Sequence, residues 1–585
     1  MTKQSIRYLF LCLVFSLTLI QTKAQNLESF GVKKGIKANG SLNLNAIGYT
    51  ASGIPVRRDP FAWFVSGNLT LNLFGYAAPF SFSYSNTSRS FTQPFNQLSF
   101  APQYKWVKTY IGYNSMTFSQ YTLSGHVFLG GGVELTPKNW RVAAMYGRLR
   151  KAVPFNLTDT TENYNASYKR MGVGFKIGYE KDNNGINVTL FHAKDDIQSI
   201  PYVLYNSNLT PKQNLVAGIS GRKKLFERVS LEAEYAYSIL TNNILYNPQA
   251  DTLSVDSLRI PEPDYFLKGI IPSNATTRHF SAYNMSVGYQ GTGYGIQVRY
   301  EEVAPEYQTL GAYYFNNDMR NITLIPSFQL FQGKLGLNAN VGWQYNNLAK
   351  LKASTTKRFV GAFNAAFTPN EQWSFSGNYS NFTTFTNIRP QTDPFFRNNL
   401  DTLNYYQINN TFNGMASHNF GDKERRHAII FNGSYQKASD VAAYEGGNNN
   451  LSDFYTGNIS YSLTLVPKNI TLSASANYYT SRMATVTTRY WGPNASVTTS
   501  FLNKTLRCTY AGSFNKNTTN GLNSGAVLNN RVNIGYTPAA KEKERGKHTF
   551  SLGLNLLRKS PTTTELSKTP AFTEFTATTN YSYSF

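Results

Sequence analysis

The last fifteen residues of the chain, Ala571 to Phe585, alternate between a largely apolar face and a polar face. Read back from the end, the apolar face carries Phe585, Tyr583 and Tyr581, and it continues through Phe575 to Ala571. A repeat of two residues is the period of a β-strand and not of a helix. The pattern therefore predicts a strand that runs to the last residue. A soluble sandwich could also end in this way, so the rest of the sequence has to decide between the two.

The N-terminus has the pattern of an export signal. Basic residues precede an apolar run of thirteen residues, Tyr8 to Ile20, and Thr22 to Ala24 places small residues at the two positions that a signal peptidase reads. The run is too short to cross a bilayer as a helix. We therefore expect residues 1–24 to be a cleaved signal peptide and residues 25–585 to be an exported chain without a lipid anchor.

The composition favours a barrel over a soluble core. Aromatic residues make up 15% of the chain, with 40 Tyr and 40 Phe, and yet the mean hydropathy is −0.36. A chain can be polar on average and still cross a membrane when lipid-facing and lumen-facing residues alternate along strands. The excess of tyrosine then fits the interfacial girdles of such a barrel. Only Cys508 remains after the signal peptide, so no internal disulfide is expected. The alternative is a secreted all-β protein with a tyrosine-rich surface.

Strand-like segments come in pairs whose connections differ in length. Some connections are turns of two to four residues with Gly, Pro or Asn, such as Pro137 to Asn139, Gly291-Thr292 and Pro369-Asn370. They alternate with longer polar connections, such as Leu149 to Ser167 and Leu240 to Arg278. An up-and-down barrel needs this alternation when one rim faces the cell interior and the other faces outside. We expect the Leu240 to Arg278 connection to lie on the cell surface.

These observations predict one fold class. The chain is expected to be all-β, a large antiparallel up-and-down transmembrane β-barrel of about 24–26 strands. Residues 25–585 are expected to form this single domain in the bacterial outer membrane. The short turns fall on the side of both termini, which places both termini in the periplasm. An Ig-type or jelly-roll sandwich would have no reason to sort its connections by length in this way.

The charge is strongly basic and unevenly distributed. The chain has 56 Lys and Arg against 32 Asp and Glu, and residues 25–156 hold 13 basic and three acidic side chains. An exported barrel meets no nucleic acid, so the expected counter-charges are lipopolysaccharide phosphates, acidic periplasmic partners or anionic solutes. The alternative is that these side chains are simply solvated. The candidate contacts to the lumen or to a partner are Arg57, Arg58, Arg89, Lys105, Arg141, Arg148 and Arg150.

Nothing in the sequence indicates catalysis. The six histidines stand singly without metal-ligand spacing, and no phosphate-binding Gly-rich loop or Gly-x-Ser-x-Gly elbow is present. The two weak candidates are Ser124 beside His126, and His192 near Asp195 and Asp196. We predict that the protein is not an enzyme and that it needs no cofactor or metal.

Alternating strands rich in Asn, Thr and Tyr, closed by the terminal Phe585, resemble outer-membrane barrels of the Bacteroidota type. The resemblance implies that Phe585, Tyr583 and Tyr581 present the signal that the barrel assembly machinery reads. TonB-dependent receptors carry a plug of more than a hundred residues before the barrel. Strand-like residues start here by about Gly35, so no such plug fits. The lipopolysaccharide-inserting translocon is similar in its expected strand number, but it has a jelly-roll domain and paired cysteines that this chain lacks.

Two function classes follow from this fold. The first is a channel or translocon-like pore that is gated by inward loops or by a partner. The second is a non-conducting scaffold that anchors surface lipoproteins or a secretion apparatus. A barrel of this size would be roughly 50 Å across. An open hole of that width would leak folded proteins, so we expect the lumen to be filled by the chain's own loops or by a periplasmic or lipoprotein partner, with the partner preferred.

Overall fold

The structure is a computed structural model that describes most of the chain after its first 35 residues. The described ranges are 36–73, 76–86, 97–155, 166–203, 209–246, 270–313, 316–350, 357–381, 384–386, 406–440, 451–483, 486–539, 546–561 and 570–585. The predicted signal peptide, residues 1–24, and the candidate residue Arg89 lie outside these ranges. Within them, no helix is long and apolar enough to cross a membrane.

The described residues form 28 strands and one short 3-10 helix, η3 (Ile197–Ser199). The first fourteen strands are β1 (Ile36–Ser52), β2 (Phe61–Leu73), β3 (Tyr76–Ser85), β4 (Gln97–Phe100), β5 (Gln103–Tyr104), β6 (Val107–Thr117), β7 (Ser124–Leu135), β8 (Trp140–Arg150), β9 (Lys169–Lys181), β10 (Asn184–Asp196), β11 (Gln213–Leu225), β12 (Val229–Thr241), β13 (Thr277–Gln290) and β14 (Tyr294–Val303). The others are β15 (Met319–Leu330), β16 (Leu335–Tyr345), β17 (Lys357–Phe367), β18 (Trp373–Ser380), β19 (Thr384–Thr386), β20 (Tyr406–Gly421), β21 (Arg425–Asp440), β22 (Leu451–Leu465), β23 (Ile470–Met483), β24 (Val486–Phe501), β25 (Leu506–Thr519), β26 (Leu522–Tyr536), β27 (Lys547–Lys559) and β28 (Phe572–Ser584).

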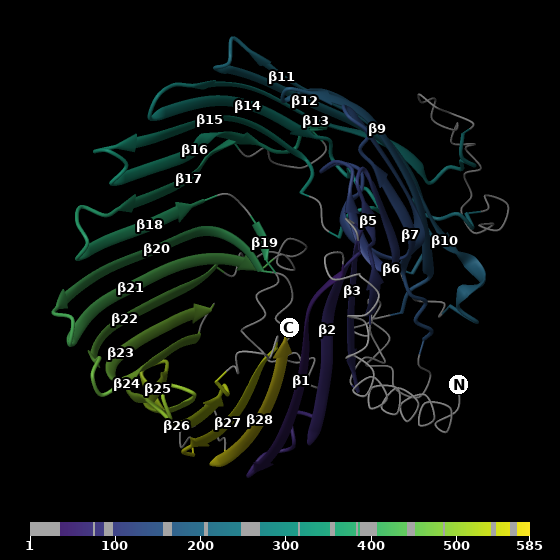
Figure 1. Ribbon diagram of the computed structural model, residues 1–585. Helices are drawn as coiled ribbons and strands as arrows, with labels where there is room; N and C mark the ends of the chain where they lie inside the picture. Colours follow the sequence, from purple (N-terminus) through teal and green to yellow (C-terminus); the bar gives the residue numbers. More distant parts are fainter. Residues whose placement is uncertain are drawn as a thin grey trace.

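These segments close into a barrel. Each strand pairs antiparallel with its neighbours in sequence, and β1 pairs with β28 from Ser41 opposite Ser584 to Ser52 opposite Thr573 (Figure 1). Segments β4 and β5 share one position between β3 and β6, and β18 and β19 share one position beside β20. The 28 described segments therefore occupy 26 positions around the ring. The predicted fold class and strand number are confirmed.

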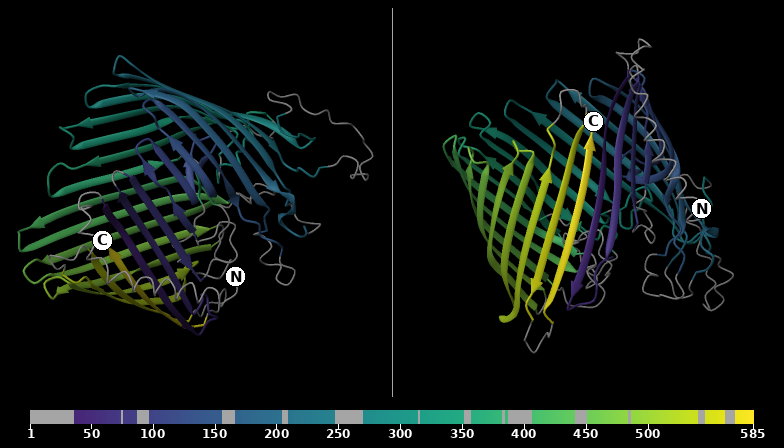
Figure 2. Two further views of the ribbon diagram at one scale, coloured as in Figure 1. Left: turned by 45° about the vertical axis from the view of Figure 1, so that its right-hand side comes forward. Right: turned by 60° about the horizontal axis from the view of Figure 1, so that its bottom comes forward.

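The connections sort by length between the two rims. One rim, which we call the short rim, carries turns such as 182–183, 226–228 and 422–424, together with the start of β1 and the end of β28. The other, the long rim, carries the long connections, including 242–276 between β12 and β13. Figure 2 shows the strands crossing steeply between these two rims.

The alternation in connection length is less strict than the sequence suggested. On the long rim, only two residues join β25 to β26 at 520–521, while ten residues, 537–546, join β26 to β27 on the short rim. The physical reason is that closure of the ring fixes where each strand ends but not how many residues the next connection must hold.

The two faces of the barrel wall differ in polarity. In β9, Val173, Phe175, Ile177 and Tyr179 are 38–45% exposed on the outer face, and the intervening residues face inward. The same alternation gives exposed apolar residues on most other strands. A closed antiparallel barrel has no unpaired strand edge, and an apolar outer face matches lipid. The chain is therefore a membrane-spanning barrel of the bacterial outer membrane.

Aromatic rings gather on the outer face near the short rim. Trp373 stacks on His418 with ring centroids 4.0 Å apart, and His418 continues the stack to Phe420 and His427 at 5.1 and 4.8 Å. Trp140 and Tyr179 form an edge-to-face pair at 5.5 Å on another part of the same rim. Amphipathic rings at this level suit the interface between lipid and water.

Candidate functional site

Two connections of the long rim fold inward against the wall. They are residues 118–123, between β6 and β7, and residues 304–313, after β14, and together we call them the inner shelf. Their apolar side chains, including Phe118, Leu123 and Leu310, form one buried cluster with inward-facing residues of the wall. The wall residues in this cluster include Phe128, Met145, Phe191, Val216, Ala236 and Ala282. The largest buried cluster of the described residues thus lies inside the barrel.

Hydrogen bonds join the two parts of the inner shelf. The Tyr307 hydroxyl donates to the backbone oxygen of Tyr121 at 2.6 Å, and the Thr309 hydroxyl donates to the backbone oxygen of Thr122 at 2.8 Å. The Ser124 amide donates to the backbone oxygen of Gly311 at 3.0 Å. All three bonds satisfy backbone oxygens that folding removes from water, so the two connections hold each other in place.

Further bonds attach the shelf to the wall. Buried Asn214 of β11 accepts the Leu310 amide at 3.0 Å through its side-chain oxygen. The Ser238 hydroxyl of β12 donates to the backbone oxygen of Gln308 at 2.7 Å. At the other end, the Lys176 ammonium group donates to the backbone oxygen of Phe118 at 3.2 Å. The shelf is therefore anchored on β9, β11 and β12.

Glycines in the wall let the shelf approach closely. A Cβ atom at Gly174 would lie 2.6 Å from the Phe118 ring, and one at Gly132 would lie 2.7 Å from the Met116 sulfur. Both distances are shorter than van der Waals contact allows. The absence of a side chain at Gly174 is therefore a condition for the packing of the shelf. Its absence at Gly132 leaves room for Met116 at the end of β6, just before the shelf.

The buried tyrosines of the shelf are neutral donors. Burial, with a smaller contribution from Glu301, raises the pKa of Tyr121 well above its ordinary range. Burial also raises the pKa of Tyr307 strongly. The Tyr121 hydroxyl donates to the Glu301 carboxylate at 2.9 Å. Both phenols therefore keep their protons and act as hydrogen-bond donors at neutral pH.

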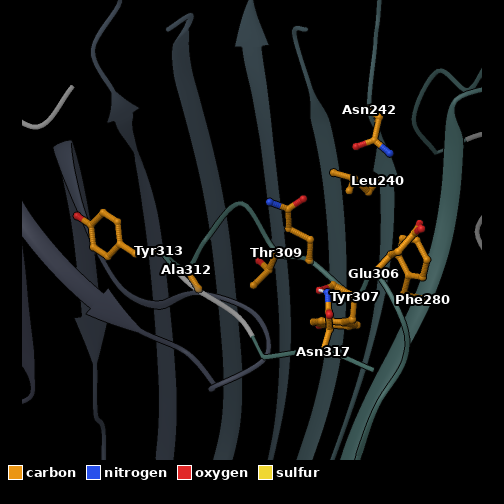
Figure 3. A pocket seen from close by; sticks show the side chains of 10 residues that line it. Leu240, Asn242, Phe280, Glu306, Tyr307, Thr309, Ala312, Tyr313 and Asn317 are labelled. Carbon is orange, nitrogen blue, oxygen red and sulfur yellow. Dashed lines mark hydrogen bonds between the residues drawn. The ribbon is translucent and has the colours of Figure 1, made fainter. Parts of the chain in front are cut away.

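A cavity lies between the shelf and the wall strands β12 and β13. Its volume is about 480 Å³. Figure 3 shows the shelf residues Tyr313, Thr309 and Tyr307 from left to right, with Leu240 and Phe280 of the wall on the right. The lining combines aromatic rings with polar groups. The polar groups are hydroxyls, side-chain amides and a carboxylate, and those beyond the residues already named come from Asn242, Glu306, Gln308 and Asn317. Such a cavity suits a small polar solute better than an apolar one.

The predicted basic residues do not form a single surface. Arg150 faces inward and lies 3.5 Å from Asp195, whereas Arg148 pairs opposite the outward-facing Met171 and donates to the Tyr113 hydroxyl at 3.0 Å. Arg148 is therefore on the lipid side of the wall and not in the lumen, because a bulge at Leu149 shifts the alternation between the two arginines.

The other predicted basic residues lie at separate places. Arg57 and Arg58 lie in the connection after β1, where Arg57 is 5.0 Å from the Phe572 ring and Arg58 is 5.3 Å from the Tyr49 ring. Arg141 pairs with Glu180 at 3.3 Å near the short rim. Lys105 occupies a short-rim turn with a positive φ of 52°.

The histidines singled out in the sequence make local contacts. The His126 ring stacks on Tyr313 of the shelf at 4.1 Å, and its Nδ1 lies 2.8 Å from the backbone oxygen of Val127. The His192 Nε2 lies 3.0 Å from the Gln213 amide nitrogen. Among the described residues, no group of three His, Cys, Asp or Glu side chains could hold a metal ion.

The C-terminal residues close the ring. Phe585 exchanges two backbone hydrogen bonds with Gly40 at 3.0 Å each. The Phe585 ring stacks on Tyr583 at 5.3 Å, and Tyr583 stacks on His548 at 4.5 Å. The Tyr581 hydroxyl lies 2.9 Å from the His548 Nδ1. These three aromatic residues thus form one outer-face cluster at the seam, on the short rim.

Comparison with known proteins gives similarity in structure only. No protein-family model matches the chain, and no curated protein is significantly similar to it in sequence. Among solved structures, the FrpB iron transporter from Neisseria meningitidis is 11% identical, with 94% of this chain and 82% of that chain covered and a TM-score of 0.36.

Two other solved structures are similar at the same level. The translocation pore of the P pilus usher PapC is 11% identical, with 94% of this chain and 99% of that chain covered and a TM-score of 0.36. OccAB2 of Acinetobacter baumannii is 8% identical, with 64% of this chain and 92% of that chain covered and a TM-score of 0.28. All three similarities are too low to assign a function, which has to be argued from this chain's own residues.

Proposed function

We propose that this barrel is a channel for small solutes whose lumen is narrowed by its own inner shelf. The observation that carries the proposal is the inward fold of residues 118–123 and 304–313, which are fixed to the inner wall by buried side chains and hydrogen bonds. A constriction of this kind lets a wide barrel pass small molecules and exclude folded proteins. A scaffold without flux has no need of a polar cavity that opens beside its inner wall.

The proposal includes an orientation. The long rim faces the cell surface, and the short rim, with the ends of β1 and β28, faces the periplasm. Outer-membrane barrels have short periplasmic turns and longer external loops, which supports this choice. Residues 251–263, the acidic and proline-rich part of the predicted surface loop, lie outside the described residues. A protease added to intact cells is expected to cut within 247–269, whereas a tag inserted at Pro369-Asn370 should stay inaccessible.

Electrical recording distinguishes the channel from the alternative scaffold. The purified full chain is inserted into planar lipid bilayers in potassium chloride, and single insertions are recorded. A channel should give stepwise current increases of uniform size that persist without added partners. A silent barrel, confirmed as folded by its heat-modifiable migration on a gel, would contradict the channel and favour the scaffold. Recovery of a bound partner after gentle purification from native membranes would support the scaffold further.

A further inference from the structure

A buried carboxylate pairs with two arginines on the inner wall near the long rim. The Asp195 side chain is fully buried and accepts two hydrogen bonds from the Arg170 guanidinium, at 2.7 and 2.9 Å. It also accepts the backbone amide of Lys212 at 2.9 Å, and the Arg150 guanidinium lies 3.5 Å away. We call these four residues the Asp195 cluster.

The Asp195 cluster carries an excess of positive charge. The one carboxylate pairs with the Arg150 and Arg170 guanidinium groups, and Lys212, whose backbone amide it accepts, adds a third cationic side chain to the cluster. Two of the three positive charges therefore have no counter-charge within the cluster. The neighbouring Asp196 does not supply one, because it pairs with Lys169 at 2.7 Å. Burial and the charge of Arg170 lower the pKa of Lys212, as a local excess of positive charge requires.

Arg150 is the arginine of the cluster that is better placed to contact a solute. Its side chain is 28% exposed, against 11% for Arg170, and its Nε atom is buried and has no hydrogen-bond partner among the described residues. Arg170 already donates two hydrogen bonds to the two carboxylate oxygens of Asp195. A guanidinium group that is held beside a carboxylate and remains partly exposed is suited to bind phosphate or carboxylate through its exposed N–H groups.

The cluster adjoins the inner shelf. Leu149, the residue before Arg150, is fully buried in the same apolar cluster as Phe118 and Leu310 of the shelf. On the neighbouring strand, the His126 ring stacks on Tyr313 of the shelf. Tyr313 in turn lines the cavity between the shelf and the wall. The positive group therefore lies on the lumenal side of the wall, on the side where the shelf packs.

We propose that Arg150, Arg170 and Lys212 form a lumenal anion site that takes the phosphate or carboxylate group of a small solute. This inference rests on the proposed channel function and names the substrate class of that channel. Lipid phosphates are not the ligand, because the cluster is on the inner face. Arg148, which faces the lipid side two residues away on the same strand, is the arginine that a lipid headgroup would meet.

Calorimetric titration tests the site without any need for conduction. Inorganic phosphate and citrate, each a separate probe, are titrated into the full detergent-solubilised chain and into the variants Arg150→Gln, Lys212→Gln and Arg148→Gln. We expect saturable binding by the wild type, about tenfold weaker binding for each of the first two variants, and unchanged binding for Arg148→Gln. Arg170 is left intact because its removal would strand the buried Asp195 carboxylate.

A labelling experiment on the wild type covers the case in which a variant fails to fold. Phosphate should slow the modification of Arg150 by phenylglyoxal and leave that of Arg148 unchanged. The site would be overturned if neither probe bound the wild type, or if Arg148→Gln weakened binding as much as Arg150→Gln. A barrel that binds phosphate but passes no current would contradict the proposed channel function and leave the anion site standing. A barrel that conducts but binds neither probe would contradict the site alone.

Discussion

The Tyr307 hydroxyl donates a hydrogen bond of 2.6 Å to the backbone oxygen of Tyr121, a residue 186 positions earlier in the chain. Tyr307 is 0% exposed and Tyr121 is 2% exposed. The bond joins two connections that leave different parts of the barrel wall, and it does so away from water. It is therefore one of the buried contacts that fix the position of the inner shelf.

Removing this donor should destabilise the barrel. Tyr307→Phe keeps the ring but removes the hydrogen bond of the Tyr307 hydroxyl to the buried backbone oxygen of Tyr121, which costs about 1–3 kcal/mol of unfolding free energy. Urea unfolding of the barrel from lipid vesicles measures the difference. Tyr146→Phe is the matched control, because Tyr146 is 62% exposed on the outer face and should lose almost nothing. Equal losses for the two variants would show that the shelf bond contributes no stability of its own.

A single methyl group should displace the shelf. In Gly174→Ala the new Cβ atom would lie 2.6 Å from the Phe118 ring, and this ring is buried and cannot turn away freely. Overpacking of this kind costs about 1–3 kcal/mol. Gly457→Ala provides the control, since a Cβ atom at that strand position meets no described atom within 4 Å. If Gly174→Ala were as stable as Gly457→Ala, the close packing of Phe118 on the wall would be wrong.

Neutralising the two adjacent acidic residues of β10 should lower the unfolding free energy by very different amounts. Asp195→Asn removes the counter-charge from buried arginines and is expected to cost about 3–5 kcal/mol of unfolding free energy. Asp196→Asn breaks the exposed pair with Lys169 and should cost no more than about 1 kcal/mol. Unfolding of the two variants under the same conditions gives the comparison. Similar costs would mean that Asp195 is not the centre of a buried cluster.

The stability gained by neutralising Lys212 should depend on pH. Burial lowers the pKa of Lys212 first, and Arg170 and Arg150 lower it further, while Asp195 opposes them. A lysine whose pKa is lower in the folded chain than in the unfolded chain destabilises the fold below the folded pKa, and this penalty fades as pH rises toward the unfolded value. Lys212→Gln should therefore be more stable than the wild type near neutral pH.

The expected advantage of Lys212→Gln disappears as the pH approaches the ordinary lysine value of 10.5. Unfolding free energies at about pH 7 and about pH 10 give the two points that are needed. A variant that is less stable than the wild type at neutral pH, or an advantage that does not change with pH, would contradict the account of the positive charge in the Asp195 cluster.

The barrel could be predicted from the sequence because its signals are local. The alternation over Ala571 to Phe585 corresponds to β28, and the turn at Pro137 to Asn139 joins β7 to β8 as expected. A strand's period and a turn's composition are both read within about ten residues. Counting such pairs was enough to give the strand number.

The inner shelf could not be predicted in the same way. Tyr121 and Tyr307 meet only because the ring of strands between them bends through a fixed curvature, and neither residue has a local pattern that reports this contact. The one available signal was glycine at inward-facing positions such as Gly132 and Gly174, but many strands contain glycine for other reasons. The lipid-facing position of Arg148 depends on a bulge at Leu149, which alternation alone does not reveal.

Single-channel conductance of a barrel that lacks the 306–313 part of its shelf tests directly whether the shelf narrows the lumen. Residues 306–313 are replaced by a short glycine–serine linker, and the same linker is placed in the 537–546 connection at the opposite rim as a control. If the shelf narrows the lumen, the first variant should show a larger unit conductance than the wild type, and the control should match the wild type. Identical unit conductance in all three proteins would contradict the account.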